Sequence, residues 1–354
     1  MKIKNLFVSE EALNFPLTKE IIKGKEYKIT TIEEIRKLSS EKKINQKDTL
    51  FLTTFPANFI KDCPCTPGYV SCGYKNINIA YNCSVGCSYC ILQDYLTYPV
   101  LTLFVNMEKL ENELNELTAK EKYLRIGTGE LTDSLIWEKL YPLSNRFNEI
   151  FRKKEEIIFE YKTKTNYIEN FKQNKNNNIL ISFSMNPPAL KKEEPFSASP
   201  QKRIQAMEHL VKLGYPVGIH FDPLIFYEGW EEDYKILIKN IFEKIPPSSI
   251  GWISIGSLRF HKNMRWVIRD NHKKSILLKT EFAEGSDNKY RYPFTVRREL
   301  YTTIIKYLND FGSNDLPIYF CMENTEMWEE LLPIKPETDI INRYLYESVK
   351  QFYS

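Results

Sequence analysis

The sequence predicts an α/β protein organised around an open barrel of six β/α units. Between Tyr74 and about Phe260, short apolar runs alternate with helical patterns. Runs such as Ile179–Phe183 and Ile250–Ile255 are rich in β-branched and aromatic residues and are separated by helical stretches. This alternation favours parallel strands joined by right-handed crossovers. After Phe260 the pattern changes, so we end the barrel there.

Six strands and five helices are expected in this central region. The strands cover 74–82, 122–129, 157–163, 179–185, 216–223 and 250–257, and the helices lie near 107–119, 134–150, 166–173, 199–213 and 231–243. Sites in parallel α/β architectures gather at the carboxyl ends of the strands. Functional residues are therefore expected directly after each strand.

The chain on either side of the barrel forms two predicted extensions. The N-terminal extension, 1–73, contains a helical pattern, a strand pattern and a Pro- and Gly-rich stretch that indicates turns; these lie at 31–41, 49–55 and 63–73. The C-terminal extension, 261–354, contains a helix, a last strand and a short helix; these are expected near 295–310, at 317–323 and from Glu326. We predict three parts, divided at 73/74 and 260/261.

Composition places the chain among globular proteins of the cytoplasm. Of its 354 residues, 42% are hydrophobic and 27% are charged, and no apolar run approaches the length of a membrane span. The N-terminus lacks the pattern of a secretory signal. Seven cysteines, an odd number, suit a reducing compartment better than a set of disulfides. A net charge of +3 does not by itself indicate nucleic acid, so such a partner must be argued from local patches.

Three cysteines directly follow the first expected strand. Cys83, Cys87 and Cys90 have the spacing C-x3-C-x2-C, which curls a short loop around one metal cluster. A cubane [4Fe–4S] cluster normally takes four thiolates, so three leave one iron with an open coordination position. An open iron can bind and reduce a substrate. The alternatives are structural thiols or a zinc site, but structural zinc needs four ligands, commonly in two separated pairs.

The cysteine stretch resembles the cluster motif of radical S-adenosylmethionine (SAM) enzymes. The resemblance implies a [4Fe–4S] cluster whose open iron chelates SAM, and reductive cleavage of SAM to a 5′-deoxyadenosyl radical. It also implies a partial barrel of six β/α units, and an electron donor such as flavodoxin or ferredoxin. The protein's share of such chemistry is binding, orientation and exclusion of side reactions.

The second expected strand ends in Gly127, Gly129 and Glu130, which is similar to the Gly-Gly-Glu element of radical SAM enzymes. Two glycines let the backbone approach a ligand closely, and a carboxylate can accept hydrogen bonds from an ammonium group. We therefore expect these residues to bind SAM, with Glu130 on its amino group. The plainer interpretation is a turn into a helix.

Beyond the superfamily, the chain resembles the spore photoproduct lyase family over roughly residues 70 to 330. The resemblance rests on residues 83–93, 163–164, 182–186 and 214–230. The family uses its adenosyl radical to split a thymine dimer back into two thymines, a DNA repair reaction that cleaves a carbon–carbon bond. By position, Lys164, Ser184 and Asn186 match residues around SAM, and Tyr89 matches a tyrosine of the radical relay. As alternatives, Ser184 and Asn186 would satisfy loop backbone and Lys164 would be a solvated charge.

Two departures separate this chain from the family pattern. The lyase keeps a cysteine at the end of strand two, which returns a hydrogen atom to the product radical, whereas 129–133 contains no cysteine. A second tyrosine expected after the third cluster cysteine is replaced by Ile91. The SAM machinery therefore carries over more readily than the substrate.

Four cysteines lie outside the motif: Cys63, Cys65, Cys72 and Cys321. The interpretation that we favour is burial as small hydrophobic residues. A sharper hypothesis is that Cys63, Cys65 or Cys72 is brought near Cys321 and ligates a second cluster or supplies the missing hydrogen atom. Cys321, on a late strand, is the best single candidate for a catalytic hydrogen donor.

A basic and aromatic segment follows the barrel: Lys289, Tyr290, Arg291 and Tyr292, with Arg297 and Arg298 nearby. Such a segment can hold phosphates and stack on a splayed-out base, as lesion-repair enzymes require. The alternative is a solvated helix face.

Three functional hypotheses remain. The leading one is a radical SAM enzyme acting on a lesion or modified nucleotide in DNA or another nucleic acid. The second is a radical SAM enzyme that modifies a peptide or small metabolite. The third is a nucleic-acid-binding protein with a structural or redox-sensing cluster.

Overall fold

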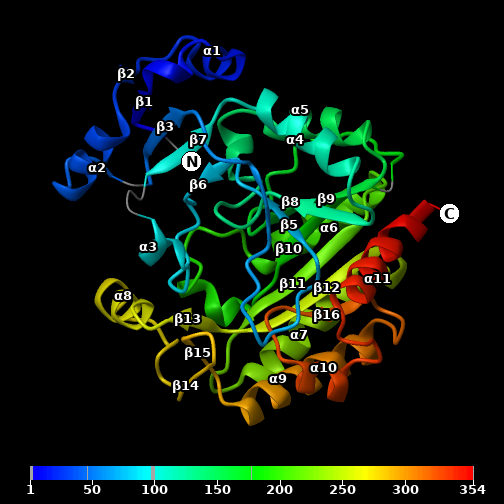
Figure 1. Cartoon of the computed structure of the whole chain (residues 1–354). Helices are drawn as coiled ribbons and strands as arrows, with labels where there is room; N and C mark the ends of the chain where they lie inside the picture. Colours follow the sequence, from blue (N-terminus) through cyan, green and yellow to red (C-terminus); the bar gives the residue numbers. More distant parts are fainter. Residues whose placement is uncertain (1–2, 46, 97–99, 177, 354) are drawn as a thin grey trace.

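The computed structural model describes residues 3–45, 47–96, 100–176 and 178–353, and its largest element is a curled, half-barrel sheet (Figure 1). The sheet has eight strands in the order β16-β12-β11-β10-β9-β8-β5-β4. Neighbouring strands are parallel except β4 and β5. The strands are β4 (Ile60–Asp62), β5 (Lys75–Ile77), β8 (Leu124–Gly127), β9 (Ile157–Thr163), β10 (Ile179–Ser184), β11 (Val217–Leu224), β12 (Ile250–Ser257) and β16 (Ile318–Phe320).

The sequence predicted most of this sheet, with one error at its first strand. The expected strand 74–82 divides into β5 and β6 (Ala80–Tyr81), and β6 belongs to a different sheet. The other five expected strands correspond to β8 to β12. The last expected strand, 317–323, forms β16 and adds a seventh parallel strand beside β12.

The helices after the strands follow the expected order, with two corrections. α4 (Glu108–Thr118), α6 (Pro200–Lys212) and α7 (Trp230–Phe242) match the predictions. The helix expected at 134–150 is a 3-10 turn, η2 (Ile136–Lys139), followed by α5 (Leu143–Arg152), because Pro142 interrupts the helical hydrogen bonds. The helix expected at 166–173 does not form. This stretch is an irregular loop in which Ile168 and Phe171 are both buried. Their spacing of three positions resembles the apolar spacing of a helix.

A second sheet of five strands, in the order β2-β1-β3-β7-β6, covers the N-terminal part of the fold (Figure 1). Its other strands are β1 (Asn5–Val8), β2 (Lys28–Ile29), β3 (Thr49–Thr53) and β7 (Leu101–Phe104), accompanied by η1 (Glu10–Ala12), α1 (Pro16–Ile22), α2 (Ile32–Ser40) and α3 (Leu92–Tyr95). Since β6 and β7 follow residue 73, this sheet draws on both sides of the expected boundary. The division into three parts stays a prediction.

The C-terminal region completes the half-barrel and supplies a small third sheet. Its elements are β13 (Arg259–His261), α8 (Met264–Asn271), β14 (Ala283–Glu284), β15 (Lys289–Arg291), α9 (Phe294–Phe311), α10 (Thr325–Leu331) and α11 (Thr338–Lys350), with η3 (Pro188–Lys192), η4 (Pro247–Ser249) and η5 (Gln351–Tyr353) as short 3-10 turns along the chain. The third sheet has the order β13-β15-β14. Among the described helices, none is long and apolar enough to cross a membrane.

Two segments cover the open side of the half-barrel between β16 and β5. Helix α11 contacts both β12 and β8, and the Asn342 side chain accepts a hydrogen bond of 3.0 Å from Arg125 Nε on β8. Above α11, residues 63–73 run from the β4 edge toward β16, where the Val70 amide donates to the Glu323 carbonyl at 2.8 Å. In Figure 1 this segment is the blue chain that descends past β5 and returns. The side of the sheet is thus closed by irregular chain.

A buried carboxylate, Glu160 on β9, ties the strands of the half-barrel together from inside. Tyr74 Oη donates to it at 2.6 Å and Trp252 Nε1 at 2.9 Å, and Ser182 also donates. His220 Nε2 lies 2.8 Å from the same carboxylate. Burial would raise the Glu160 pKa, but His220, Lys162 and Ser182 hold the pKa well below its usual range.

Candidate functional site

The three motif cysteines lie on a tight loop directly after β6. The loop begins at Asn82, a non-glycine residue with a φ of 70°, whose side chain accepts a hydrogen bond of 2.8 Å from the Cys83 amide. Asparagine tolerates this left-handed conformation because its short side chain bonds the local backbone. Gly86 has a φ of 67° and turns the chain back between Cys83 and Cys87. The loop therefore places three thiols on one short stretch.

Two side chains missed by sequence reasoning hold this loop in place. Gln93 Nε2 donates to the carbonyls of Cys87 and Ser88 at 3.0 and 3.1 Å. The amide oxygen of Gln93, Oε1, lies 2.8 Å from Nε2 of His272, which directly follows α8. Glu193 accepts from the Ser88 hydroxyl, and also from the Ile276 amide at 2.9 Å. The cysteine loop is thus fixed to the chain that follows η3 and α8.

The three thiols are close enough to interact electrostatically. Burial raises the pKa of Cys83 well above its usual value, and Asp133, Cys87 and Cys90 raise it further. Cys87 is buried, whereas Cys83 and Cys90 are partly exposed. Loading a metal cluster would therefore release protons, because thiolates are the ligands.

The three thiols do not form a group that could hold a single metal ion. Within the described ranges, no three His, Cys, Asp or Glu side chains converge closely enough to hold one ion. A tetrahedral zinc ion, with Zn–S bonds of about 2.3 Å, would need sulfurs about 3.8 Å apart. In a cubane each iron takes its own thiolate, so the sulfurs stand farther apart. The donor set therefore fits an iron–sulfur cluster with three protein ligands.

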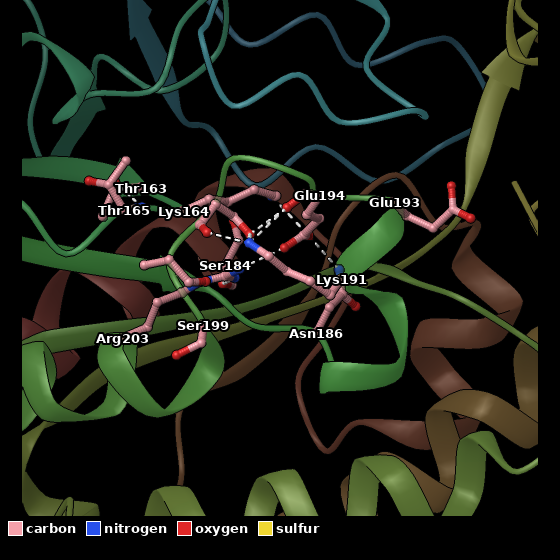
Figure 2. Close-up of polar contacts among 12 residues, drawn as sticks. Thr163, Lys164, Thr165, Ser184, Asn186, Lys191, Glu193, Glu194, Ser199 and Arg203 are labelled. Carbon is pink, nitrogen blue, oxygen red and sulfur yellow. Dashed lines mark hydrogen bonds and ion pairs between the residues drawn. The ribbon is translucent and has the colours of Figure 1, made fainter. Parts of the chain in front are cut away.

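Residues predicted at or near SAM contact one buried carboxylate, Glu194 (Figure 2). Asn186 Nδ2 donates to it at 2.9 Å, and the Tyr89 hydroxyl also donates. Lys164 Nζ lies 4.0 Å from the same carboxylate. These three residues come from the ends of β9 and β10 and from the cysteine loop, so Lys164 and Asn186 meet the expected relay tyrosine, Tyr89, in space.

Arg203 on α6 neutralises Glu194 and fixes the end of β10. Its Nη2 lies 2.7 Å from a Glu194 oxygen, and its Nη1 donates to the Ser184 carbonyl. Both charged side chains are almost completely buried, at 1% and 3% exposed. Burial would raise the Glu194 pKa, but Arg203 and Lys164 lower it to about 2. Ser184 is itself buried, so it contributes its backbone to this group of side chains.

Asp133 positions Lys164 from the neighbouring strand end. The Lys164 amide donates to Asp133 at 2.6 Å, and the Thr163 hydroxyl donates to it at 2.8 Å. Thr132, the preceding residue, donates to the Asn82 carbonyl at 2.8 Å. The end of β8 therefore binds both the cysteine loop and the Lys164 turn.

The two glycines of the Gly127–Glu130 element have a packing role in the fold. A Cβ on Gly127 would lie 2.0 Å from the Tyr74 hydroxyl oxygen, and one on Gly129 would lie 2.5 Å from Lys162 Cβ. Both glycines are thus required by protein packing. Glu130 lies exposed at the rim, with Lys162 and Lys61 as charged neighbours, and partial burial of its carboxyl raises its pKa.

Cys321 lies apart from the Glu194 group, directly after β16. Its sulfur is 3.2 Å from Arg259 Nη2, and Arg259 is paired with Asp222 at 3.0 Å. Burial raises the Cys321 pKa well above its usual value, and Asp222 and Cys63 raise it further. The role of Cys321 as a hydrogen donor stays a prediction.

The basic and aromatic segment is only partly available to a ligand. Arg291 is 3% exposed and donates to Asp287 at 2.7 Å, and Tyr292 is completely buried. These two residues therefore do not support the nucleic-acid contact expected of them. Lys289 and Tyr290 remain partly exposed on β15. Arg297 is also buried, in an ion pair with Glu323 at 2.8 Å.

The Glu194–Arg203 ion pair is central to the site, yet only one feature of the sequence indicates it. Arg203 falls on the same face of the 200–212 helix as Met207 and Leu210, all of which are buried. A charge in an apolar stripe indicates a buried partner. Glu193 and Glu194 follow a Pro-rich turn with no periodic pattern, so no local signal marked them.

Comparisons with known proteins identify the family of this chain. The family model described as spore photoproduct lyase matches residues 2–320, a span that includes the N-terminal sheet. Spore photoproduct lyase of Bacillus subtilis (strain 168) is 25% identical over 257 residues, covering 69% of this chain and 75% of that protein. Spore photoproduct lyase of Geobacillus sp. (strain Y412MC61) is 23% identical over 347 residues, covering 90% and 98%.

Solved structures share the fold. Spore photoproduct lyase complexed with dinucleoside spore photoproduct gives a TM-score of 0.76 at 21% identity, covering 90% of this chain and 99% of that chain. A variant of the lyase with bound AdoMet and dinucleoside spore photoproduct gives 0.77, also at 21% identity, with the same coverage of 90% and 99%. At this identity, the likeness establishes the half-barrel architecture.

Proposed function

Because the chain belongs to the spore photoproduct lyase family of radical SAM enzymes, we propose that it cleaves SAM and directs the resulting radical at a nucleic-acid lesion or modified nucleotide. The observation that carries this proposal is the meeting of the cysteine loop with Lys164, Asn186 and Tyr89 around Glu194. These residues come from separate segments. The family resemblance implies a position near SAM for Lys164 and Asn186 and a part in the radical relay for Tyr89.

Cys83, Cys87 and Cys90 would hold a [4Fe–4S] cluster, with SAM on the open iron. When bound, cluster and SAM together would supply a 5′-deoxyadenosyl radical. Asn82, Gln93 and Glu193 fix the loop through hydrogen bonds within the protein, which supports a preformed site. A preorganised site avoids the entropic cost of ordering the loop when SAM binds.

The carboxylates have different roles in this proposal. Glu194 already accepts from Tyr89 and Asn186 and pairs with Arg203, so it orders protein groups. Glu130 lies exposed at the rim, two residues from Thr132, which bonds the cysteine loop. We therefore assign the SAM ammonium group to Glu130.

The residues nearest the expected reaction are Tyr89 and Lys164. Lys164 Nζ lies 5.8 Å from the centre of the Tyr89 ring, and both side chains face Glu194. Lys164 would place a positive charge beside the cluster thiolates and the SAM carboxylate. Tyr89 would carry a hydrogen atom as part of a radical relay, as the family resemblance implies.

The nucleic-acid part of the proposal depends on the exposed half of the basic segment. Lys289 would contact a phosphate, and Tyr290 would stack on a base. The small third sheet holds both residues on a short strand, next to β13 at the end of the half-barrel.

A second candidate function is radical SAM chemistry on a peptide or small metabolite. The burial of Arg291 and Tyr292 favours it, because it halves the basic and aromatic surface that a nucleic acid would need. Salt dependence separates the two candidates. Phosphate contacts release counterions, so duplex DNA should bind with an affinity that falls steeply between 50 and 200 mM salt. Weak binding that is insensitive to salt would favour the second candidate.

The proposed chemistry is tested by anaerobic reconstitution with iron and sulfide, followed by incubation with SAM and dithionite. We expect 5′-deoxyadenosine and methionine as products. A reconstituted protein that binds iron but forms no 5′-deoxyadenosine would instead support a structural or redox-sensing cluster. A matched reaction without dithionite controls for spontaneous breakdown of SAM.

A further inference from the structure

A surface pocket of about 370 Å³ lies against the cysteine loop. It is lined by Lys192, Glu193 and residues 270–275, which end α8 and follow it. Glu193 accepts a hydrogen bond from the Ser88 hydroxyl, so this wall of the pocket rests directly on the loop. Figure 2 shows the Glu193 side chain pointing away from the group around Glu194. The pocket and the proposed SAM site therefore lie on opposite sides of this turn.

Two further side chains extend this surface along the loop. A Cβ on Gly86 would lie 2.8 Å from Lys47 Nζ, and the same ammonium group lies 4.6 Å from the centre of the Phe196 ring. The Phe196 amide donates to the Val85 carbonyl at 3.2 Å. Val85 is three residues from Ser88, so the pocket and these side chains belong to one surface. We call it the loop surface, and its side chains are those of Lys47, Lys192, Phe196, Lys273 and Lys274.

The loop surface is positively charged. All four of its lysines are exposed, and none forms an ion pair in the part of the chain that the structure describes. The two carboxylates in the pocket wall do not offset this charge, because Glu193 is buried and Asp270 lies 3.0 Å from Arg269. Unpaired cations on one face attract a negatively charged partner and raise its rate of association.

Large apolar side chains are exposed beside these lysines. The Phe196 side chain is 63% exposed, and Ile91, which directly follows Cys90, is 39% exposed. Protein interfaces combine an apolar or aromatic centre with a polar rim, and encounters between redox proteins use small interfaces of this kind. The loop surface therefore suits a brief complex with an acidic protein.

The position of the loop surface favours an electron donor over the nucleic-acid substrate. A substrate must reach the radical on the side of Lys164, Tyr89 and Glu194, whereas the loop surface lies behind the turn that carries Glu194 (Figure 2). An electron donor needs only to approach the cluster. Duplex DNA is also held through many phosphate contacts, and the loop surface offers only lysines, without the bidentate arginine that phosphates favour.

We propose that the loop surface is the docking site of an acidic one-electron carrier protein, which reduces the cluster held by Cys83, Cys87 and Cys90. The carrier gives one electron to the [4Fe–4S]²⁺ cluster, so the carrier is oxidised by one electron and the cluster becomes [4Fe–4S]⁺. No bond forms or breaks in this step, and no proton moves. This inference rests on the proposed function, because it names the partner that supplies the electron for SAM cleavage.

The first test measures binding of oxidised flavodoxin, an acidic flavin carrier, to the reconstituted protein by isothermal titration. Wild type should bind with an affinity that falls as salt rises. K273E/K274E should bind about tenfold more weakly at low salt, because two attractive charges become repulsive. K153E/K154E is the matched control and should bind normally, since this adjacent pair precedes β9, at the other end of that strand from Lys164.

Lys47→Glu changes a different segment of the loop surface and should also weaken flavodoxin binding, which guards against misfolding of K273E/K274E. Equal affinity of wild type, K273E/K274E and Lys47→Glu would overturn the proposal. Duplex DNA binding that is lost in these variants while flavodoxin binding is kept would overturn it as well, and would assign the surface to nucleic acid.

A second test compares two reductants by following the visible absorbance of the cluster. Reduction by reduced flavodoxin should slow about tenfold in K273E/K274E. Reduction by dithionite should be unchanged, because this small reductant needs no docking site. Equal slowing with both reductants would contradict a docking role. Wild type that is reduced by flavodoxin but forms no 5′-deoxyadenosine would contradict only the proposed function.

Discussion

The two groups of cysteines in this protein are placed in opposite ways. Cys83, Cys87 and Cys90 lie within eight residues of one another (83 to 90), on a loop shaped by Asn82 and Gly86. The second group, Cys63, Cys65, Cys72 and Cys321, is spread over residues 63–73 and the residue after β16, at the two edges of the sheet. A contiguous motif can be recognised in the sequence, whereas residues that only the tertiary structure brings together can be recognised only in the folded protein.

Their electrostatic surroundings differ as well. The SAM loop faces Lys164 and the Glu194–Arg203 pair, and it offers three thiols. The second group faces Arg259, Lys162 and Lys289. Three ligands leave a coordination position for a substrate, so the first group suits catalysis.

The largest expected effect separates the two groups directly. C83A/C87A/C90A should abolish 5′-deoxyadenosine formation, because no thiolate remains to hold the SAM-binding cluster. C63A/C65A/C72A should retain it with dithionite as reductant. The measurement is chromatographic quantification of 5′-deoxyadenosine, and a C83A/C87A/C90A protein that still formed it would refute the assignment of the cluster ligands.

The next effect concerns the Glu194–Arg203 pair beside the SAM loop. Glu194→Gln should lower the free energy of unfolding by about 3–5 kcal/mol, because it leaves the Arg203 charge buried without its partner. Urea denaturation measures this change. Glu208→Gln, on the same helix as Arg203 but paired with Lys212 at the surface, is the matched control and should change stability little.

The same pair gives the protein an acid-sensitive step. The Glu194 pKa is lowered from 4.5 to about 2 in the folded protein, so its contribution is complete above pH 4.5 and is lost as pH falls toward 2. The contribution is about 3 kcal/mol, since one pKa unit is worth about 1.4 kcal/mol. Between these pH values, the free energy of unfolding should therefore depend less on pH in Glu194→Gln than in wild type. Equal pH slopes in the two proteins would count against this role of Glu194.

A smaller effect is expected at the rim. Glu130→Gln should weaken SAM binding by about 1–3 kcal/mol, the scale of a lost charge-assisted hydrogen bond. Isothermal titration of the reconstituted protein measures it, with Glu284→Gln on the third sheet as a control that should bind SAM normally. Unchanged affinity in Glu130→Gln would show that another group binds the SAM amino group.

The smallest effects are expected at the nucleic-acid surface. Lys289→Ala should weaken duplex binding and reduce the slope of log affinity against log salt by about 1, since one phosphate contact is lost. Tyr290→Ala should cost about 1–3 kcal/mol on a substrate with an unstacked base. Fluorescence anisotropy at several salt concentrations measures both. Normal binding by a variant with both substitutions, Lys289→Ala and Tyr290→Ala, would show that this segment does not contact the nucleic acid.

Sequence reasoning succeeded where the signal was local. The strands β8 to β12 and the cysteine loop were predicted because each is a contiguous run with its own pattern. The convergence of Lys164, Asn186 and Tyr89 was also anticipated, since strand ends in a parallel sheet share one edge.

The failures came from long-range structure. Strand 74–82 divides between two sheets because β6 pairs with β7, an element about twenty residues later along the chain. Arg291 and Tyr292 looked like a ligand surface, but Asp287 and the Phe226 amide satisfy them inside the protein. Glu194 was missed because its partner Arg203 lies on the next helix. Burial and pairing of this kind depend on tertiary neighbours that no local pattern specifies.

The central claim is that the SAM loop acts on a nucleic-acid lesion in a chain with no thiol at the end of β8. The most direct measurement follows 5′-deoxyadenosine and thymine release together, in anaerobic reactions of a spore-photoproduct-containing oligonucleotide. The proteins are wild type and Cys63→Ala, Cys65→Ala, Cys72→Ala and Cys321→Ala. We predict 5′-deoxyadenosine in every reaction and slow repair in each, because residues 129–133 contain no cysteine to return a hydrogen atom to the product radical. Fast, clean repair that survives all four substitutions would contradict this account.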